Sequence, residues 1–404
     1  MADDVRAQAP LRRYDLDWLR VLLFALLVLH HAAVGFADFG ADTYGFANDR
    51  LGGDLWSLWI YFNHTWRLPA LFLIAGIGTW FATSRGIGAR FLASRLGRLL
   101  LPTIFGAFVL NMAAGFAIAR VTGEYSGLAD FIRGWWLSPE PHQVMHLWFL
   151  VNLAIYTLLT WPLFLARDRL ARMRVAPQRL LLGLAVSVTL VAVLLKPYGA
   201  ALTGEGYQFP WYWGIFAAGY VIGAQHRPIL DWTARWWWAL LLAGLLGFAV
   251  EVGVLAVYSE SDPLFGTYLS SGGWAASGVL PAYAVSTVIY TFAEGANAWL
   301  FSLTAVGLCA RYLNRPSPGL RALTRATFPI YVLHFPLTIV GLALLTLIDW
   351  GWGLEFMLLV LGVYVGTALL YLAALRAGPA IALIGGRREA ISQISKVAPR
   401  ADSV

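Results

Sequence analysis

The chain has 404 residues, of which 59% are hydrophobic and 13% are charged, and its formal net charge at pH 7 is +7. This balance is typical of an integral membrane protein and excludes an ordinary soluble globule. The single cysteine, Cys309, excludes a disulfide within the chain and a cysteine-rich metal site. We therefore predict an all-α membrane protein and expect no metal.

Ten apolar segments are long enough to cross a bilayer. The first is too long for a cleaved signal peptide, lacks a small-residue cleavage site, and carries Arg20 and His31. Glu294 and Gly295 interrupt the eighth. The ten segments cover approximately residues 17–37, 56–83, 99–119, 144–166, 180–196, 208–225, 236–257, 284–310, 327–348 and 354–375.

Basic residues alternate between the loops that join these segments, and most of the 29 Lys and Arg side chains fall on one side. The positive-inside rule then places both termini in the cytoplasm. The charge is explained by topology, so we expect a lipid bilayer and no nucleic acid as partner. Residues 1–16 form a cytoplasmic segment, 17–376 the membrane domain and 377–404 a basic cytoplasmic tail. Abundant Arg, Gly and Trp with scarce Lys suggest a GC-rich bacterial genome. The membrane would then be the bacterial inner membrane.

Arg20 and His31 share one face of the first span. Eleven helical residues turn through about 1100°, three turns plus roughly 20°, and rise about 16 Å. His30 is rotated by about 100° from His31. A cation at the membrane mouth and an imidazole deeper on the same face indicate a functional groove. Arg20 taken alone could equally be a boundary cation that extends to the interface.

Several other polar side chains lie inside the spans, where a charge costs at least ~2.5–3.5 kcal/mol. Together they predict a hydrated cavity lined by Arg and His. Arg67 is too deep to reach either surface easily. His146 could instead bind a loop carbonyl, and His334 could join two helices. The substrate-binding or structural candidates are His64, His146, Trp148, Glu294, Tyr331 and His334.

A second cluster lies at the inner end of the third span. Arg95 and Arg98 are three residues apart, so they share a helix face and could hold a phosphate. The alternative is ordinary positive-inside flanking. The motifs of common soluble enzymes, such as a Walker loop, a GxSxG elbow or HExxH, are absent from the sequence.

These motifs resemble those of the acyltransferase family 3 membrane proteins. Arg20-x10-His31 resembles the Arg/Lys-x10-His signature of this family, and Arg95-x-x-Arg98 with Pro102 resembles its second motif. Residues 67–76 resemble the Arg-x-Pro-x-Phe-Phe segment, with Ala75 in place of the commoner Ser. Residues 146–150 and 331–338 resemble most the glucan biosynthesis protein C branch. The resemblance covers roughly residues 15–375.

The resemblance implies acyl transfer from a cytoplasmic acyl-CoA to a carbohydrate hydroxyl on the far side of the membrane. The branch implies succinylation of osmoregulated periplasmic glucan, with succinyl-CoA as donor. Departures from that branch in the outer loops leave the acyl group, succinyl or acetyl, and the acceptor sugar open. The oligomeric state is also left open.

Roles follow from this reading. Arg90, Arg95 and Arg98 would hold the CoA phosphates. Arg20 would steady the pantetheine arm. His31 would act as general base, or would take the acyl group itself; we favour the base. Arg67 would stabilise the oxyanion or position His31. The rival hypothesis is a proton-coupled transporter or polysaccharide exporter, because buried Arg and His also suit a carrier.

Overall fold

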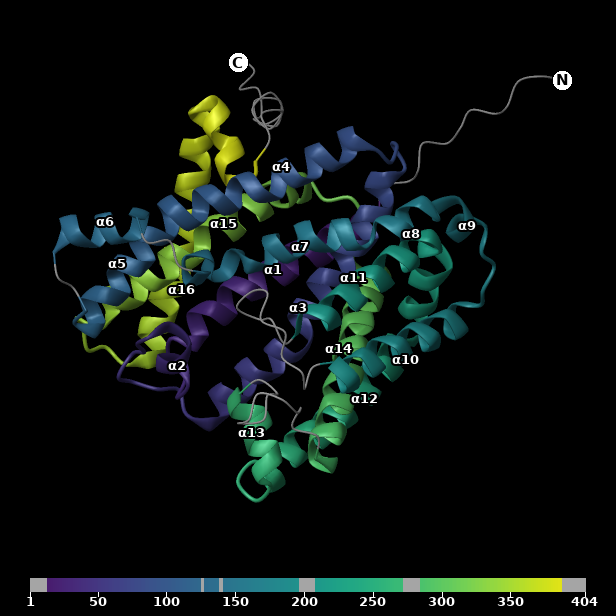
Figure 1. Cartoon of the computed structure of the whole chain (residues 1–404), viewed down its shortest axis with the longest axis horizontal. Helices are drawn as coiled ribbons and strands as arrows, with labels where there is room; N and C mark the ends of the chain where they lie inside the picture. Colours follow the sequence, from purple (N-terminus) through teal and green to yellow (C-terminus); the bar gives the residue numbers. More distant parts are fainter. Residues whose placement is uncertain (1–12, 125–126, 138–140, 196–207, 272–283, 387–404) are drawn as a thin grey trace, which may run out of the picture.

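The computed structural model describes residues 13–124, 127–137, 141–195, 208–271 and 284–386, and this part of the chain holds helices and no strands. Figure 1 shows the arrangement. The helices are α1 Tyr14–Val34, α2 Gly40–Tyr44, α3 Asp54–Thr83, α4 Ala89–Phe105, the π-helical turn η1 Gly106–Leu110, α5 Asn111–Thr122, α6 Leu128–Leu137, the 3₁₀ segment η2 Pro141–Leu147, α7 Trp148–Leu159, α8 Trp161–Leu165, α9 Arg167–Arg172, α10 Pro177–Leu195, α11 Phe209–Ala224, α12 His226–Tyr258, α13 Pro263–Ser271, α14 Val285–Tyr312, α15 Leu320–Leu345, α16 Trp352–Arg376 and the 3₁₀ segment η5 Gly378–Ile384.

Helix length and hydropathy confirm an all-α membrane protein. Each of the ten predicted segments overlaps a helix. Four of the predicted segments correspond to helices that are not among the six stretches named at the end of this paragraph. Of these helices, α3 and α14 are long but carry more polar side chains, and α7 and α11 are short. Ten spans and cytoplasmic termini therefore stay predictions. Among the described residues, six helical stretches are long and apolar enough to cross a membrane: Tyr14–Val34, Ala89–Thr122, Pro177–Leu195, His226–Tyr258, Leu320–Leu345 and Trp352–Arg376.

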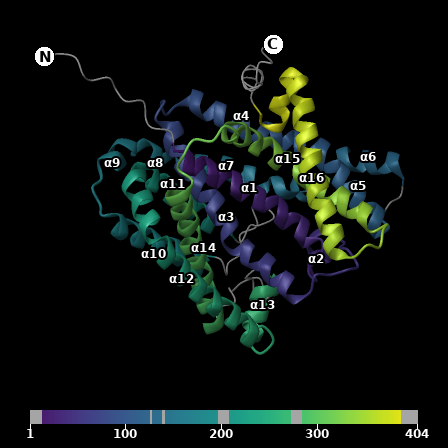
Figure 2. The same cartoon turned by 180° about the vertical axis from the view of Figure 1, so that it is seen from behind.

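Helix α1 lies in the middle of the bundle and packs against α3, α14, α15 and α16. Figure 2 shows it from behind, crossing between α15 and α3. In both views α4 lies along one side of the molecule and α2 and α13 lie toward the opposite side. This separation matters because residues of α4 and residues of α2 and α13 belong to different cavities.

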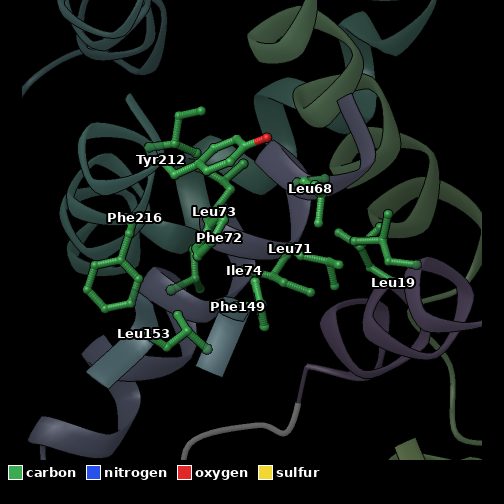
Figure 3. Packing of buried hydrophobic residues seen from close by; sticks show 14 of the residues in the cluster. Leu19, Leu68, Leu71, Phe72, Leu73, Ile74, Phe149, Leu153, Tyr212 and Phe216 are labelled. Atoms are coloured by element: carbon green, nitrogen blue, oxygen red, sulfur yellow. The ribbon is translucent and has the colours of Figure 1, made fainter. Parts of the chain in front are cut away.

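Close helix packing depends on small residues, as is common in membranes. A Cβ atom on Gly76 of α3 would lie 2.1 Å from the backbone oxygen of Phe216 in α11, and one on Gly219 would lie 2.2 Å from that of Leu73. These glycines let the two backbones touch. Around them, large apolar side chains from α3, α7 and α11 fill the core, as Figure 3 shows for Phe72, Phe149 and Tyr212 among others.

The long helix from Ala89 to Thr122 is continuous through the π-helical turn η1. Pro102, one turn earlier, lacks the amide hydrogen of a regular helix, which favours such an irregularity. η1 packs against η2. A side chain on Gly106 would meet Leu147 at 2.4 Å, so the absence of one lets η2 approach. The helix thereby positions the segment that carries His146.

Candidate active site

A cavity of about 880 Å³ lies between α1, α3, α7 and α15 and extends to residues of α2 and α13. Six of the residues selected from the sequence line it, although they come from four separate parts of the chain. The cavity therefore brings together the buried histidines and arginine that the sequence predicted to share a site. Its polar lining consists of His30, His31, Thr43, Tyr44, Tyr61, His64, Arg67, His146, Trp148 and Tyr331.

His31 is held by a hydrogen-bonded pair of histidines. His31 Nδ1 lies 2.7 Å from Nε2 of His334, and Nδ1 of His334 lies 2.7 Å from the backbone oxygen of Tyr331. The two imidazole rings stack with centroids 5.0 Å apart and planes at 7°. His334 is fully buried and does not line the cavity.

These contacts determine the tautomers of the neutral rings. A carbonyl only accepts, so Nδ1 of His334 carries the hydrogen and its Nε2 is the acceptor. Nδ1 of His31 must then donate to His334, which leaves the lone pair of His31 on Nε2. Because His31 lines the cavity, that lone pair is available as a base. The helix-joining role considered for His334 is thus real, and it also orients His31.

The end of α1 is closed by side chains from the segment that follows. The last carbonyls of a helix lack partners within it. Tyr44 Oη donates to the backbone oxygen of His31 at 2.9 Å, and Trp56 Nε1 donates to that of Ala33 at 3.1 Å. The Tyr44 bond holds α2 over the cavity, and both bonds fix the last turn of α1. They leave His31 at a helix C-terminus, where the helix dipole favours positive charge.

Arg67 lies deep in the cavity wall with 1% of its surface exposed. Its charge acts electrostatically on the imidazoles of His31 and His334. His30 also lines the cavity and stacks on His64 with ring centroids 6.0 Å apart. Rotation from Arg20 did not predict this position for His30, because the cavity is wider than one helix face.

His146 is presented by a strained backbone. The η2 segment breaks at Met145, whose φ of 44° and ψ of −130° are unusual for a residue other than glycine and cost ~1–3 kcal/mol. Asn111 Nδ2 holds the segment by donating to the carbonyls of Gln143 at 2.8 Å and Val144 at 3.2 Å. The strain is therefore balanced by hydrogen bonds from α5.

The His146 side chain binds a carbonyl of a neighbouring helix, not the loop carbonyl considered from the sequence. Nε2 donates to the backbone oxygen of Val332 at 3.3 Å, and the backbone oxygen of His146 accepts from Tyr331 Oη at 2.5 Å. Two bonds thus tie η2 to α15. Trp148, in the next helix, also lines the cavity.

Glu294 lies outside the cavity, in a polar cluster beyond the wall formed by Tyr61. Tyr61 Oη donates to the buried Glu251 and lies 2.8 Å from Tyr290 Oη. Asn297 Nδ2 donates to Glu251 at 2.6 Å. Glu294, 7% exposed, acts electrostatically on both tyrosines. Tyr61 links this cluster to the cavity and was missed because an isolated tyrosine gives no sequence signal.

Arg20 does not line the cavity that holds His31. Its guanidinium lies beside Gly78 of α3, where an added Cβ would come within 3.6 Å of it. It also lies 3.9 Å from Asp17. The shared helix face predicted for Arg20 and His31 is compatible with this separation, because the cavity covers only the second half of α1.

A second cavity of about 540 Å³ lies between the end of α3 and α4. Arg90, Arg95 and Arg98 line it, as does Arg85, whose place before α4 gave no sequence signal beyond ordinary flanking charge. Arg95 Nε donates to Thr157 Oγ1 at 2.8 Å, which fixes its side chain against α7. Four arginines that line one hollow form a site suited to phosphate groups.

Buried core separates the two cavities. They share no lining residue; along α3 the first ends at Leu71 and the second begins at Ala82. Eleven helical residues rise about 16 Å. Between them lie the buried side chains of Phe72 and Ile77. Arg20, beside Gly78, lies at this intermediate level.

No group of three or more His, Cys, Asp or Glu side chains in the described ranges is placed to hold a metal ion. His31 is instead bound to His334, His334 to the backbone oxygen of Tyr331, and His146 to that of Val332.

No curated protein and no solved structure matches the chain. Residues 13–372 match the family model of the acyltransferase domain of acyltransferase family 3. The match begins just before α1 and ends within α16, so it contains both cavities. Because it covers nearly the whole chain, the protein belongs to acyltransferase family 3.

Proposed function

We propose that the protein is a membrane-embedded O-acyltransferase that moves a succinyl or acetyl group from cytoplasmic acyl-CoA to a hydroxyl of an extracytoplasmic glycan, such as osmoregulated periplasmic glucan. The observation that carries the proposal is the oriented base: His31 keeps its Nε2 lone pair in a cavity, while its Nδ1 is held by His334. Family membership supports acyl transfer as the reaction. The proposed location is the bacterial inner membrane, with ten spans and both termini cytoplasmic.

In the proposed reaction the acceptor hydroxyl binds in the larger cavity. Nε2 of His31 takes the hydroxyl proton as the oxygen forms a bond to the thioester carbonyl carbon. Arg67 stabilises the negative charge that develops on the carbonyl oxygen. The carbon–sulfur bond then breaks, and the CoA sulfur takes the proton from Nε2. The ester and free CoA are released, and His31 returns to its neutral state.

The histidine pair favours this base mechanism. When His31 gains a proton, its Nδ1–H bond to His334 becomes a charge-assisted hydrogen bond. The C-terminal end of α1 also favours positive charge at this position. Both effects act only while the imidazole is protonated, which is the requirement for lowering the barrier.

The arginine cavity is the proposed site for the phosphates of the donor. CoA carries three phosphate groups, and Arg85, Arg90, Arg95 and Arg98 supply matching positive charge. The pantetheine arm would follow α3 toward Leu71 and pass Arg20. The apolar side chains between the cavities must therefore move apart when the acyl group is delivered. With α4 on the cytoplasmic side, as the positive-inside rule predicts, donor and acceptor approach from opposite sides of the membrane.

The test uses purified protein in proteoliposomes with labelled acetyl-CoA or succinyl-CoA and a soluble β-glucan oligosaccharide. We expect CoA release and label on the oligosaccharide. His31→Ala should abolish both, and His30→Ala, which leaves the His31–His334 pair intact, should lose much less. Near-wild-type turnover by His31→Ala would refute the assignment. Flux of an intact solute without acyl chemistry would support the rival transporter.

A further inference from the structure

His146 has one ring nitrogen that the protein itself does not use. Its Nε2 donates to the backbone oxygen of Val332, so in the neutral ring Nδ1 carries the lone pair. Nδ1 is buried and has no hydrogen-bond partner among the described residues, and the whole residue is 5% exposed. Buried acceptors nearly always have a partner. Because His146 lines the larger cavity, that partner is expected to be a ligand.

The surroundings keep this nitrogen in place. The ring of His146 stacks on Phe335, with centroids 5.0 Å apart and planes at 19°. Its backbone oxygen is bound by Tyr331, and the strained turn before it is held by Asn111. Strain retained at a cavity wall is typical of a functional position. The acceptor nitrogen is therefore preorganised, with little freedom to turn toward another partner.

His146 and the proposed base, His31, both contact His334. The ring centroids of His31 and His146 lie 5.0 Å and 5.1 Å from that of His334. Both rings line the same cavity, and each is left with one unprotonated nitrogen by its bonds to the protein. A ligand that satisfies both nitrogens needs two hydroxyl donors close together. One such hydroxyl would be the reacting group at His31.

We propose that His146 Nδ1 accepts a hydrogen bond from a second hydroxyl of the acceptor, so that the enzyme selects diols and sugars over simple alcohols. The inference rests on the proposed function, because it assumes that His31 is the base and that the acceptor enters this cavity. It adds the residue that would recognise a second hydroxyl of that acceptor.

The experiment compares propan-1-ol, propane-1,2-diol and propane-1,3-diol as acceptors at equal concentration, with labelled acetyl-CoA or succinyl-CoA and enzyme in nanodiscs. Hydrolysis by water provides an internal reference. In the wild type, we expect one of the diols to be acylated about 5- to 10-fold faster than propan-1-ol, corrected for the number of hydroxyls, which is the size of one hydrogen bond.

Two variants distinguish the role of the acceptor nitrogen of His146 from that of its flat ring. His146→Phe keeps a flat ring against Phe335 but removes both ring nitrogens, the acceptor Nδ1 and the donor to Val332, so the preference for the diol should fall to about 1. His146→Asn places an amide oxygen near the position of Nδ1 and should keep part of the preference. In both variants the KM for the acyl donor should stay within about twofold of the wild type, because the arginine cavity lies in another part of the structure.

Equal rates with all three alcohols, acylation of none, or an unchanged diol preference in His146→Phe would overturn the proposal. Failure of the proposed function looks different: wild-type protein would then release no CoA from the donor under any condition. The proposal is supported when the wild type prefers a diol and His146→Phe loses that preference while still releasing CoA.

Discussion

Replacement of His334 should slow the chemical step without touching either substrate site. His334→Phe preserves a ring that can stack on His31 but removes the nitrogen that accepts from its Nδ1. The His31 hydrogen is then buried without a partner and gains by moving to Nε2, which is the wrong tautomer for a base. His334→Gln is the matched variant, because its amide oxygen can still accept from Nδ1.

The size of the effect follows from the bond that is lost. A buried donor without a partner costs about 1–3 kcal/mol. If the cost appears in the transition state, each ~1.4 kcal/mol lowers kcat tenfold. We therefore expect kcat of His334→Phe to fall between about 5-fold and about 150-fold. For His334→Gln, which keeps one of the two hydrogen bonds, the loss should stay below about tenfold.

The assay is release of CoA, followed with a thiol reagent on enzyme in nanodiscs. The single cysteine of the chain, Cys309, is buried, so the protein should contribute little background. The KM for the donor should not change, because the arginine cavity shares no residue with the histidine pair. Equal kcat in His334→Phe and wild type, or equal losses of kcat in the Phe and Gln variants, would refute the proposal that His334 orients His31. Unchanged Tm in both variants excludes unfolding as the cause.

Three further predictions test other parts of the structure. Arg98→Ala and Arg95→Ala should raise the KM for acyl-CoA about tenfold or more at an unchanged kcat, and dephospho-CoA thioesters should show a smaller effect; donor kinetics like those of the wild type would remove both residues from the site. Asn111→Ala should release the strained turn at Met145 and lower kcat by about tenfold, and Asn111→Asp, which lacks the amide donor, should behave alike. Wild-type activity in both variants would show that the turn keeps its conformation without the hydrogen bonds from Asn111. Glu355→Gln should lower Tm and reduce the free energy of unfolding by about 1.5–3 kcal/mol, because the buried carboxylate accepts hydrogen bonds from two side chains and two backbone amides. The KM for the donor should stay the same. An unchanged Tm would show that the carboxylate does not stabilise the fold.

Patterns within one helix predicted much of what the structure contains. The spacing of Arg95 and Arg98 indicated a shared face, and both line one cavity. The depth of Arg67 and His31 in apolar segments indicated a buried polar site, and they share the other cavity. Such inferences succeed because helix geometry depends on local sequence.

Contacts between different helices could not be predicted from these local patterns. His31 and His334 are 303 residues apart, and nothing in either segment says which helix faces the other. Periodicity also overestimated the link between Arg20 and His31, because it gives a common face but not the length of the cavity along it. The turn at Met145 has no local signal, since methionine does not favour a positive φ; tertiary hydrogen bonds impose it.

The buried core between the two cavities has a consequence for the cell. A continuous polar passage across an energised membrane would leak protons and ions. Phe72, Ile77 and their apolar neighbours seal the described part of the bundle between the arginine cavity and the histidine cavity. In the proposed reaction, the same apolar core would keep the thioester of the donor away from water on the far side until the acyl group is delivered. A protein built in this way can remain in the membrane between reactions without conducting protons or ions across it.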